Sequence, residues 1–179
     1  MSVAEIHAPL ELRSMGSTPP PPSFDVARTP RVLVLGYGNP GRQDDGLGPA
    51  AAALIGGLGW PGVNAFDAYQ LDIEDAMDVA DHDLVWFVDA AKTGAAPFAV
   101  SEISPNFTME FTSHLVRPET ILAMAHRYFG NAPQAFLLGI RGYDFEFVEG
   151  LTPSADANLQ LAVAMLSGSL RALRSAVAS

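Results

Sequence analysis

Short apolar runs alternate along the chain with longer stretches in which apolar residues recur every three or four positions. The short runs predict β-strands near residues 31–36, 63–68, 84–89, 98–103 and 135–141. The longer stretches predict helices near residues 47–58, 72–80, 118–129 and 153–176. The last helix has one apolar stripe suited to core packing, formed by Ala155, Leu159, Ala162, Leu166, Leu170, Leu173 and Val177. We therefore expect an α/β fold, a three-layer α/β/α sandwich around a mostly parallel sheet of about five strands.

The segment between the first strand and the first helix has the most distinctive sequence. Residues 34–49 read VLGYGNPGRQDDGLGP, so that a turn expected at Gly36, Gly38 and Asn39 leads to two adjacent acids, Asp44 and Asp45. In open α/β sheets, ligands bind at the edge where strands hand over to helices. An Asp at such a boundary is also commonly a helix cap, and this alternative stays open here.

The same turn matches the spacing Gly-x-Gly-x-x-Gly of dinucleotide sites, from Gly36 to Gly41. In such a site the helix begins at the third glycine and its N-terminus faces the pyrophosphate. Here the residues Arg-Gln-Asp-Asp intervene and bring two negative charges to that place. Repulsion between these carboxylates and phosphate argues against a bound nucleotide.

Asp89 and His114 are further candidates for a functional site. Asp89 ends a run apolar enough for the buried centre of a parallel sheet, where a charge is costly unless it has a function. A strand end that faces the surface is the simpler explanation. His114 comes before Pro118, which suits the first turn of a helix, so the histidine is expected on the preceding loop. A single loop histidine is usually just exposed.

Together these features resemble the signature of the hydrogenase maturation endopeptidases. That family has a Gly-x-Gly-Asn turn, an acidic pair and a second Gly-x-Gly after its first strand, and the resemblance extends here from about Arg31 to the C-terminus. It implies a phosphorylase/hydrolase-like sandwich in which Asp45, Asp89 and His114 bind a metal ion and act in catalysis. Asp44 is then expected to cap the helix or to support the ligands.

The resemblance also implies a function. The protein is expected to be a cytoplasmic endopeptidase that removes the C-terminal extension of a nickel-iron hydrogenase large-subunit precursor once nickel is inserted. The metal is expected to be nickel, brought by the substrate or held by the enzyme, with zinc or cadmium as substitutes in vitro. Three roles stay open: nickel as a recognition signal, a metal that activates water, and a direct aspartic mechanism by the two carboxylates. A nonenzymatic nickel-binding assembly factor is the alternative function.

The loop after the second predicted strand departs from the family pattern. Family members commonly have Asp-Gly-Gly-Thr there, whereas this chain has Asp67, Ala68, Tyr69, Gln70 and Leu71. In the family this loop is linked to recognition of the particular hydrogenase, so we expect it to be the substrate-recognition loop. The simpler interpretation is that Tyr69 and Gln70 are ordinary strand-end and turn residues.

Charge argues against nucleic acid as a partner. The formal net charge is -10, and the cations are one lysine, Lys92, and nine scattered arginines, which cannot form a basic face for phosphates. The glycine turn also resembles the opening of peptidyl-tRNA hydrolases. That family has a catalytic histidine shortly after the turn, whereas this chain has Arg-Gln-Asp-Asp, so this activity is a weaker alternative.

The remaining features place the chain in a broad class. A hydrophobic content of 49% in 179 residues suits one core, and we expect one catalytic domain over residues 30–179. Residues 1–29 contain a proline run and are expected to be a mobile or surface-hugging tail. No apolar stretch approaches the roughly 20 residues of a membrane span, so no membrane partner is expected. The absence of cysteine limits metal ligands to oxygen and nitrogen, and His7, His82 and His126 are expected to have no ligand role.

Overall fold

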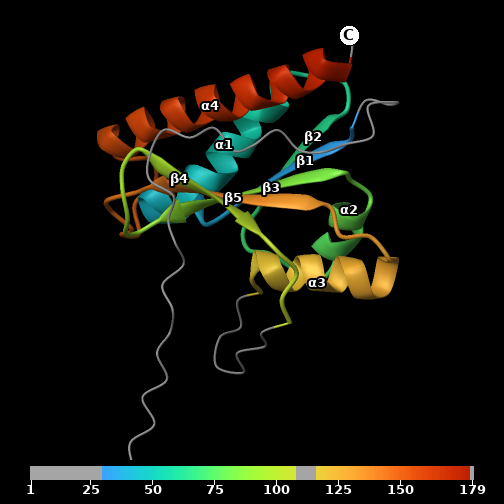
Figure 1. The fold of residues 1–179 in the computed structure, drawn as a ribbon. Helices are drawn as coiled ribbons and strands as arrows, with labels where there is room; N and C mark the ends of the chain where they lie inside the picture. The colour runs from blue at the N-terminus through green and yellow to red at the C-terminus, as the bar shows by residue number, and fades with distance from the viewer. Residues whose placement is uncertain (1–29, 108–115, 178–179) are drawn as a thin grey trace, which may run out of the picture.

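Five strands form a single sheet in the order β2-β1-β3-β5-β4 (Figure 1). The computed structural model describes residues 30–107 and 116–177. The strands are β1 Val32–Tyr37, β2 Val63–Ala68, β3 Leu84–Ala91, β4 Phe98–Ile103 and β5 Gln134–Arg141. The β1 strand pairs in parallel with β2 and β3, β3 pairs in parallel with β5, and β4 runs antiparallel to β5. The carboxyl ends of four strands therefore meet at one edge of the sheet.

Helices cover both faces of the sheet. The helices are α1 Leu47–Gly56, α2 Asp75–Ala80, α3 Pro118–Phe129 and α4 Pro153–Val177, with a short 3₁₀ helix, η1, at Pro40–Gly46. The α1 and α4 helices lie on one face, whereas α2 and α3 lie on the other (Figure 1). The predicted fold class, a three-layer sandwich with a mostly parallel sheet, is confirmed.

The predicted elements differ from the observed ones in two places near the site. A 3₁₀ helix separates the turn from α1, where the sequence predicted a direct passage from turn to helix. The second helix begins at Asp75 and not near residue 72, because residues 72–75 first form a turn in which the N–H of Asp75 donates to the Asp72 carbonyl at 3.1 Å.

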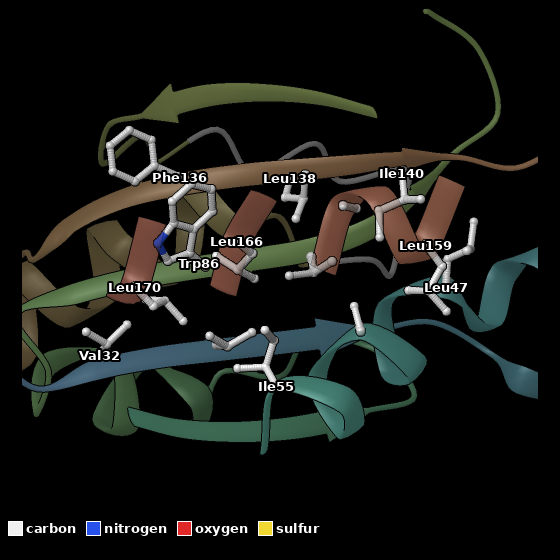
Figure 2. Close-up of a cluster of buried hydrophobic side chains, with 14 of the residues drawn as sticks. Val32, Leu47, Ile55, Trp86, Phe136, Leu138, Ile140, Leu159, Leu166 and Leu170 are labelled. Carbon is white, nitrogen blue, oxygen red and sulfur yellow. The ribbon is translucent and has the colours of Figure 1, made fainter. Parts of the chain in front are cut away.

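The core consists of two apolar clusters, one on each face of the sheet. Alternate residues of β3 enter different clusters: Trp86 and Val88 face α1 and α4, whereas Val85 and Phe87 face α2 and α3. Figure 2 shows the first cluster, in which the rings of Trp86 and Phe136 stack with centroids 4.8 Å apart. From Leu84 to Val88 the β3 strand is buried on both sides and apolar at every position, as predicted for a central parallel strand, and Asp89 follows this run.

The apolar stripe of α4 packs against the first cluster. Its residues from Ala155 to Leu170 expose at most 3% of their surface, and Leu173 packs at the end as a partly buried residue. Thr152 caps this helix, since its hydroxyl accepts from the N–H of Ala155 at 3.2 Å. Packing therefore explains this stripe, as predicted.

Two features of the sequence lie outside the described residues. They are the tail predicted for residues 1–29 and the candidate ligand His114. Among the residues that the structure describes, no helix has the length and apolar character to cross a membrane.

Candidate active site

A cleft of about 670 Å³ opens at the carboxyl edge of the sheet. Its walls are the turn after β1, the loop after β2, the end of β3 and residues 116–118 at the start of α3. This is the point where the strand order reverses, because the connection from β1 leads to β2 on one side and β3 lies on the other side. Such a switch point is the usual binding site of open α/β sheets.

Glycine allows α1 to approach the ends of β1 and β3 closely. A Cβ atom on Gly36 would overlap the carbonyl of Gly48, and a Cβ on Gly48 would overlap the carbonyls of Tyr37 and Val88. Gly38 has φ of 142°, which disfavours other residues, and a Cβ there would overlap the carbonyl of Asp45. The predicted turn glycines are thus required by packing, and this packing brings Asp45 to the strand ends.

Asp45 and Asp89 line this cleft together. The backbone N–H of Asn39 donates to Asp45 Oδ2 at 3.1 Å. The N–H of Ala90 donates to Asp89 Oδ1 at 2.7 Å, and the hydroxyl of Tyr37 also forms a hydrogen bond with the Asp89 carboxylate. Residues from the end of β1 therefore orient both acids, which come from different segments.

The environment of Asp89 disfavours its charge. Burial is the main cause that raises its pKa, from 3.8 to about 6, and the negative charge of Asp45 raises it further. The Ala90 N–H, the Tyr37 hydroxyl and the Lys92 ammonium oppose this shift without cancelling it. Burial and the charge of Asp89 also raise the pKa of Tyr37 well above its usual value, so the phenol stays protonated as a donor.

Asp44 has a different role from its neighbour. It is fully buried, and its carboxylate accepts four hydrogen bonds from the segment between β5 and α4. The donors are the N–H groups of Tyr143, Asp144 and Thr152 and the Thr152 hydroxyl, at 2.7, 3.0, 2.7 and 2.9 Å. Burial alone would raise the pKa of Asp44, but these bonds outweigh it and the pKa is lowered.

Of the two roles expected for Asp44, capping of the following helix is therefore wrong, and support of the ligands stays a prediction. The N-cap position of α1 is Gly46, which forms no side-chain capping bond. Asp44 instead stabilises the approach to α4, since both the backbone and the side chain of the capping residue Thr152 donate to it. Asp44 therefore stabilises a loop that lies about one hundred residues further along the sequence.

The predicted recognition loop borders the cleft and contacts the glycine turn. Tyr69 is 66% exposed, and its hydroxyl accepts a hydrogen bond from Asn39 Nδ2 at 2.8 Å. Gln70 is exposed beside it, whereas Leu71 is buried in the core cluster under α2 and α3. Leu71 therefore anchors the loop, and Tyr69 and Gln70 present polar atoms to the cleft. Asp67 and Ala68 do not line the cleft.

The structure describes His82 and His126 but not the predicted ligand His114. His114 lies outside the described residues, although Val116, two positions later, lines the cleft. His82 is buried and has a structural role, with Nδ1 2.6 Å from the Asp78 carbonyl and Nε2 2.8 Å from Asn64 Nδ2. His126 is exposed on α3. Residues 30–107 and 116–177 contain no group of three His, Cys, Asp or Glu side chains placed to bind a metal.

The acid pair nevertheless suits a cation. Carboxylate oxygens are suitable ligands for divalent metals, and two of them line a cleft in which negative charge is already disfavoured. A cation would relieve both the burial of Asp89 and its repulsion from Asp45. The described part of the chain would supply two such ligands, and other coordination positions would then stay open.

Several residues of this cleft were not expected from the sequence, among them Tyr37, Arg42 and Lys92. Tyr37 occupies the variable position between two glycines, where nothing local indicates its contact with Asp89. Arg42 and Lys92 also line the cleft. The only signal for Lys92 was its place as the single lysine, three residues after a strand-end acid.

The chain resembles known proteins in its three-dimensional structure, whereas its sequence matches no family model. No curated protein matches it either. Among solved structures, the maturation protease HycI of Thermococcus kodakarensis superposes with a TM-score of 0.64 at 21% identity, over 79% of this chain and 92% of that one. This chain has the fold of the hydrogenase maturation proteases. HybD from E. coli has a TM-score of 0.61 at 24% identity, over 79% and 92% of the two chains.

A third protein of this fold is the hydrogenase 2 maturation peptidase of a Thaumarchaeota archaeon. It has a TM-score of 0.58 at 26% identity and covers 78% of this chain and 97% of its own. The maturation-protease fold therefore spans nearly the whole of each neighbour. The resemblance read from the glycine turn and the acids is confirmed at the level of structure.

Proposed function

We propose that this protein is a hydrogenase maturation endopeptidase. Its substrate would be a nickel-iron hydrogenase large-subunit precursor, from which it removes the C-terminal extension after nickel insertion. The observation that carries the proposal is the acid pair Asp45 and Asp89, which lines one cleft at the switch point of a maturation-protease fold. Neighbours with this fold, from an archaeon and a bacterium, are described as hydrogenase maturation proteases.

The acids would engage nickel carried by the precursor. Asp45 and Asp89 supply oxygen ligands and His114 is the predicted nitrogen ligand, so that positions remain for groups of the substrate. Tyr37 and Asn39 would hold the two carboxylates in place by the hydrogen bonds described above. Nickel in the cleft would bring the adjoining extension to the acids, and only a metallated precursor would dock productively.

The step that cuts the peptide has two further versions. A metal bound to the acids would supply a water of lowered pKa as the nucleophile. Alternatively, the carboxyl pair would act directly, since the raised pKa of Asp89 makes it a proton donor or acceptor near neutral pH. Both versions allow a nickel-free precursor to be cut, with a metal of the enzyme's own or with the acids alone. The recognition role of nickel does not allow this, so one experiment separates it from them.

The test is incubation of the protein with nickel-loaded and nickel-free precursor, followed by intact-mass measurement. We expect the loaded precursor to lose its C-terminal mass and the nickel-free precursor to stay intact until nickel is added. Equal cutting of both forms would remove the recognition role of nickel. Retention of nickel on the protein without any mass loss would overturn the protease proposal in favour of an assembly factor.

A further inference from the structure

The segment between β5 and α4 is irregular but firmly held. Three consecutive residues of η1 bind it: the Arg42 guanidinium donates to the Phe145 carbonyl at 3.2 and 3.3 Å, the Gln43 N–H donates to the Val148 carbonyl at 2.8 Å, and the Asp44 N–H donates to the Asp144 carbonyl at 3.0 Å. The buried Asp44 carboxylate adds four further bonds. A segment held in this way loses little conformational freedom when it binds a partner.

This segment nevertheless exposes apolar side chains. Phe147 is 80% exposed, the largest value among the large apolar side chains of the described residues, and Val148 is 54% exposed. Polar residues are the rule at exposed loops, because loops run over the surface of the protein. Aromatic residues, Phe among them, are enriched at the core of protein interfaces relative to the rest of the surface.

The segment between β5 and α4 adjoins the acid-lined cleft through two cations, of which Arg42 contacts the exposed Phe147. The Arg42 guanidinium lies 4.9 Å from the centre of the Phe147 ring, and the Lys92 ammonium lies 4.9 Å from the centre of the Phe145 ring. Both cations also line the cleft. The surface is therefore continuous from the acids, across Arg42, to Phe147.

Strand order places this surface opposite the predicted recognition loop. The loop at residues 67–71 follows β2 on one side of β1 and β3, and the segment at 142–152 follows β5 on the other side. A substrate that reaches Asp45 and Asp89 between them therefore has a contact surface on each flank. Only the first of these was expected, from the family resemblance, to select the substrate.

We propose that Phe147 and Val148 form a docking surface for the folded body of the hydrogenase precursor, an inference that rests on the function proposed above. The exposed carboxylates of Glu146 and Glu149 flank the apolar pair. The matching patch on the precursor is therefore apolar and bordered by basic side chains. The cleft binds the metal and the extension, whereas this surface binds the protein that carries them.

The test compares steady-state cleavage of nickel-loaded precursor by four proteins. They are the wild type, the double variant Phe147→Ser/Val148→Ser, the double variant Glu146→Gln/Glu149→Gln, and the control Phe129→Ser on the far face of the sheet. Phe129 is 52% exposed at the end of α3. We expect the apolar variant to raise KM about tenfold with kcat unchanged, as for loss of an interface anchor. The charge variant should raise KM less and make it less dependent on salt, and the control should match the wild type.

Each other outcome contradicts the inference. An unchanged KM in the apolar variant, with its unfolding midpoint preserved, would overturn the docking surface while leaving the protease function intact. A wild-type dimer in sedimentation that the apolar variant loses would show that a second copy of this chain covers the surface. A wild type that neither binds nor cuts the precursor would overturn the proposed function and the docking surface together.

Discussion

Replacing Asp89 by Asn should make the protein more stable while abolishing the proposed activity. The pKa of Asp89 is raised because burial and the charge of Asp45 disfavour its ionised form. A rise from 3.8 to about 6 corresponds to a cost of about 3 kcal/mol at pH 7. An amide at this position keeps an acceptor for the Ala90 N–H and the Tyr37 hydroxyl but carries no charge. We allow for residual solvent contact and expect a gain of roughly 1–3 kcal/mol.

The stability gained by D89N should increase with pH, because the cost that it removes is the cost of the ionised carboxylate. Below pH 3.8 the carboxyl is protonated in both folded and unfolded chains, so the wild type and D89N should have the same stability. Between pH 3.8 and about 6 the unfolded chain ionises while the folded chain resists, and the advantage of D89N should grow. Above about pH 6 the stability advantage of D89N should be constant.

Thermal unfolding at several pH values measures this difference. At pH 7 the expected gain corresponds to a rise in Tm of roughly 2–10 °C for a protein of this size. The control is Asp81→Asn, since Asp81 is exposed at the end of α2 and far from the cleft. A D89N protein that is no more stable than the wild type at pH 7, or whose advantage is equally large at pH 3.5, would refute the argument.

Four further predictions follow from the site and the tail. Asp44→Ala should lower the free energy of unfolding by roughly 2–4 kcal/mol in denaturant titrations, because the N–H groups of Tyr143, Asp144 and Thr152 lose their fully buried acceptor. A loss below about 0.5 kcal/mol, the size expected for an exposed position, would contradict this. Gly-Gly-Thr in place of residues 68–70 should slow precursor cleavage, because the Tyr69 contact with Asn39 is lost. The Tm should stay near the wild-type value. A normal cleavage rate would show that the loop does not select the substrate. A shortened chain that begins at Thr29 should keep its Tm, whereas a large drop would show that the tail packs on the domain. His114→Ala should weaken nickel binding in calorimetry, and unchanged affinity would exclude it as a ligand.

The main elements of the fold could be predicted because their signals are local. The β3 run from Leu84 to Val88 is apolar at every position, and α4 repeats apolar residues over its length from Ala155 to Leu173. The convergence of Asp45 and Asp89 on one cleft was also predictable, because the carboxyl ends of parallel strands share an edge. Their role in catalysis or metal binding stays a prediction.

What the sequence could not indicate depends on contacts between distant residues. Asp44 and Asp45 are adjacent and chemically identical, yet one is buried against Thr152 and the other lines the cleft. Gln43, just before them, has φ of 48°, which is unusual for a residue other than glycine and rotates the chain between Arg42 and Asp44. No periodicity encodes such a bend. The bond between Tyr37 and Asp89 likewise forms only once β1 and β3 are paired.

The most direct test of the central claim is the rate at which nickel-loaded precursor loses its C-terminal mass with different variants. Wild type and the control Asp81→Asn should cut at the same rate, whereas Asp45→Asn and Asp89→Asn should each lower it by at least about a hundredfold, as expected for groups that contact the reacting centre. Both variants should remain folded, and D89N should be the more stable protein. Cleavage by either of them at the wild-type rate would contradict the assignment of this cleft as the active site.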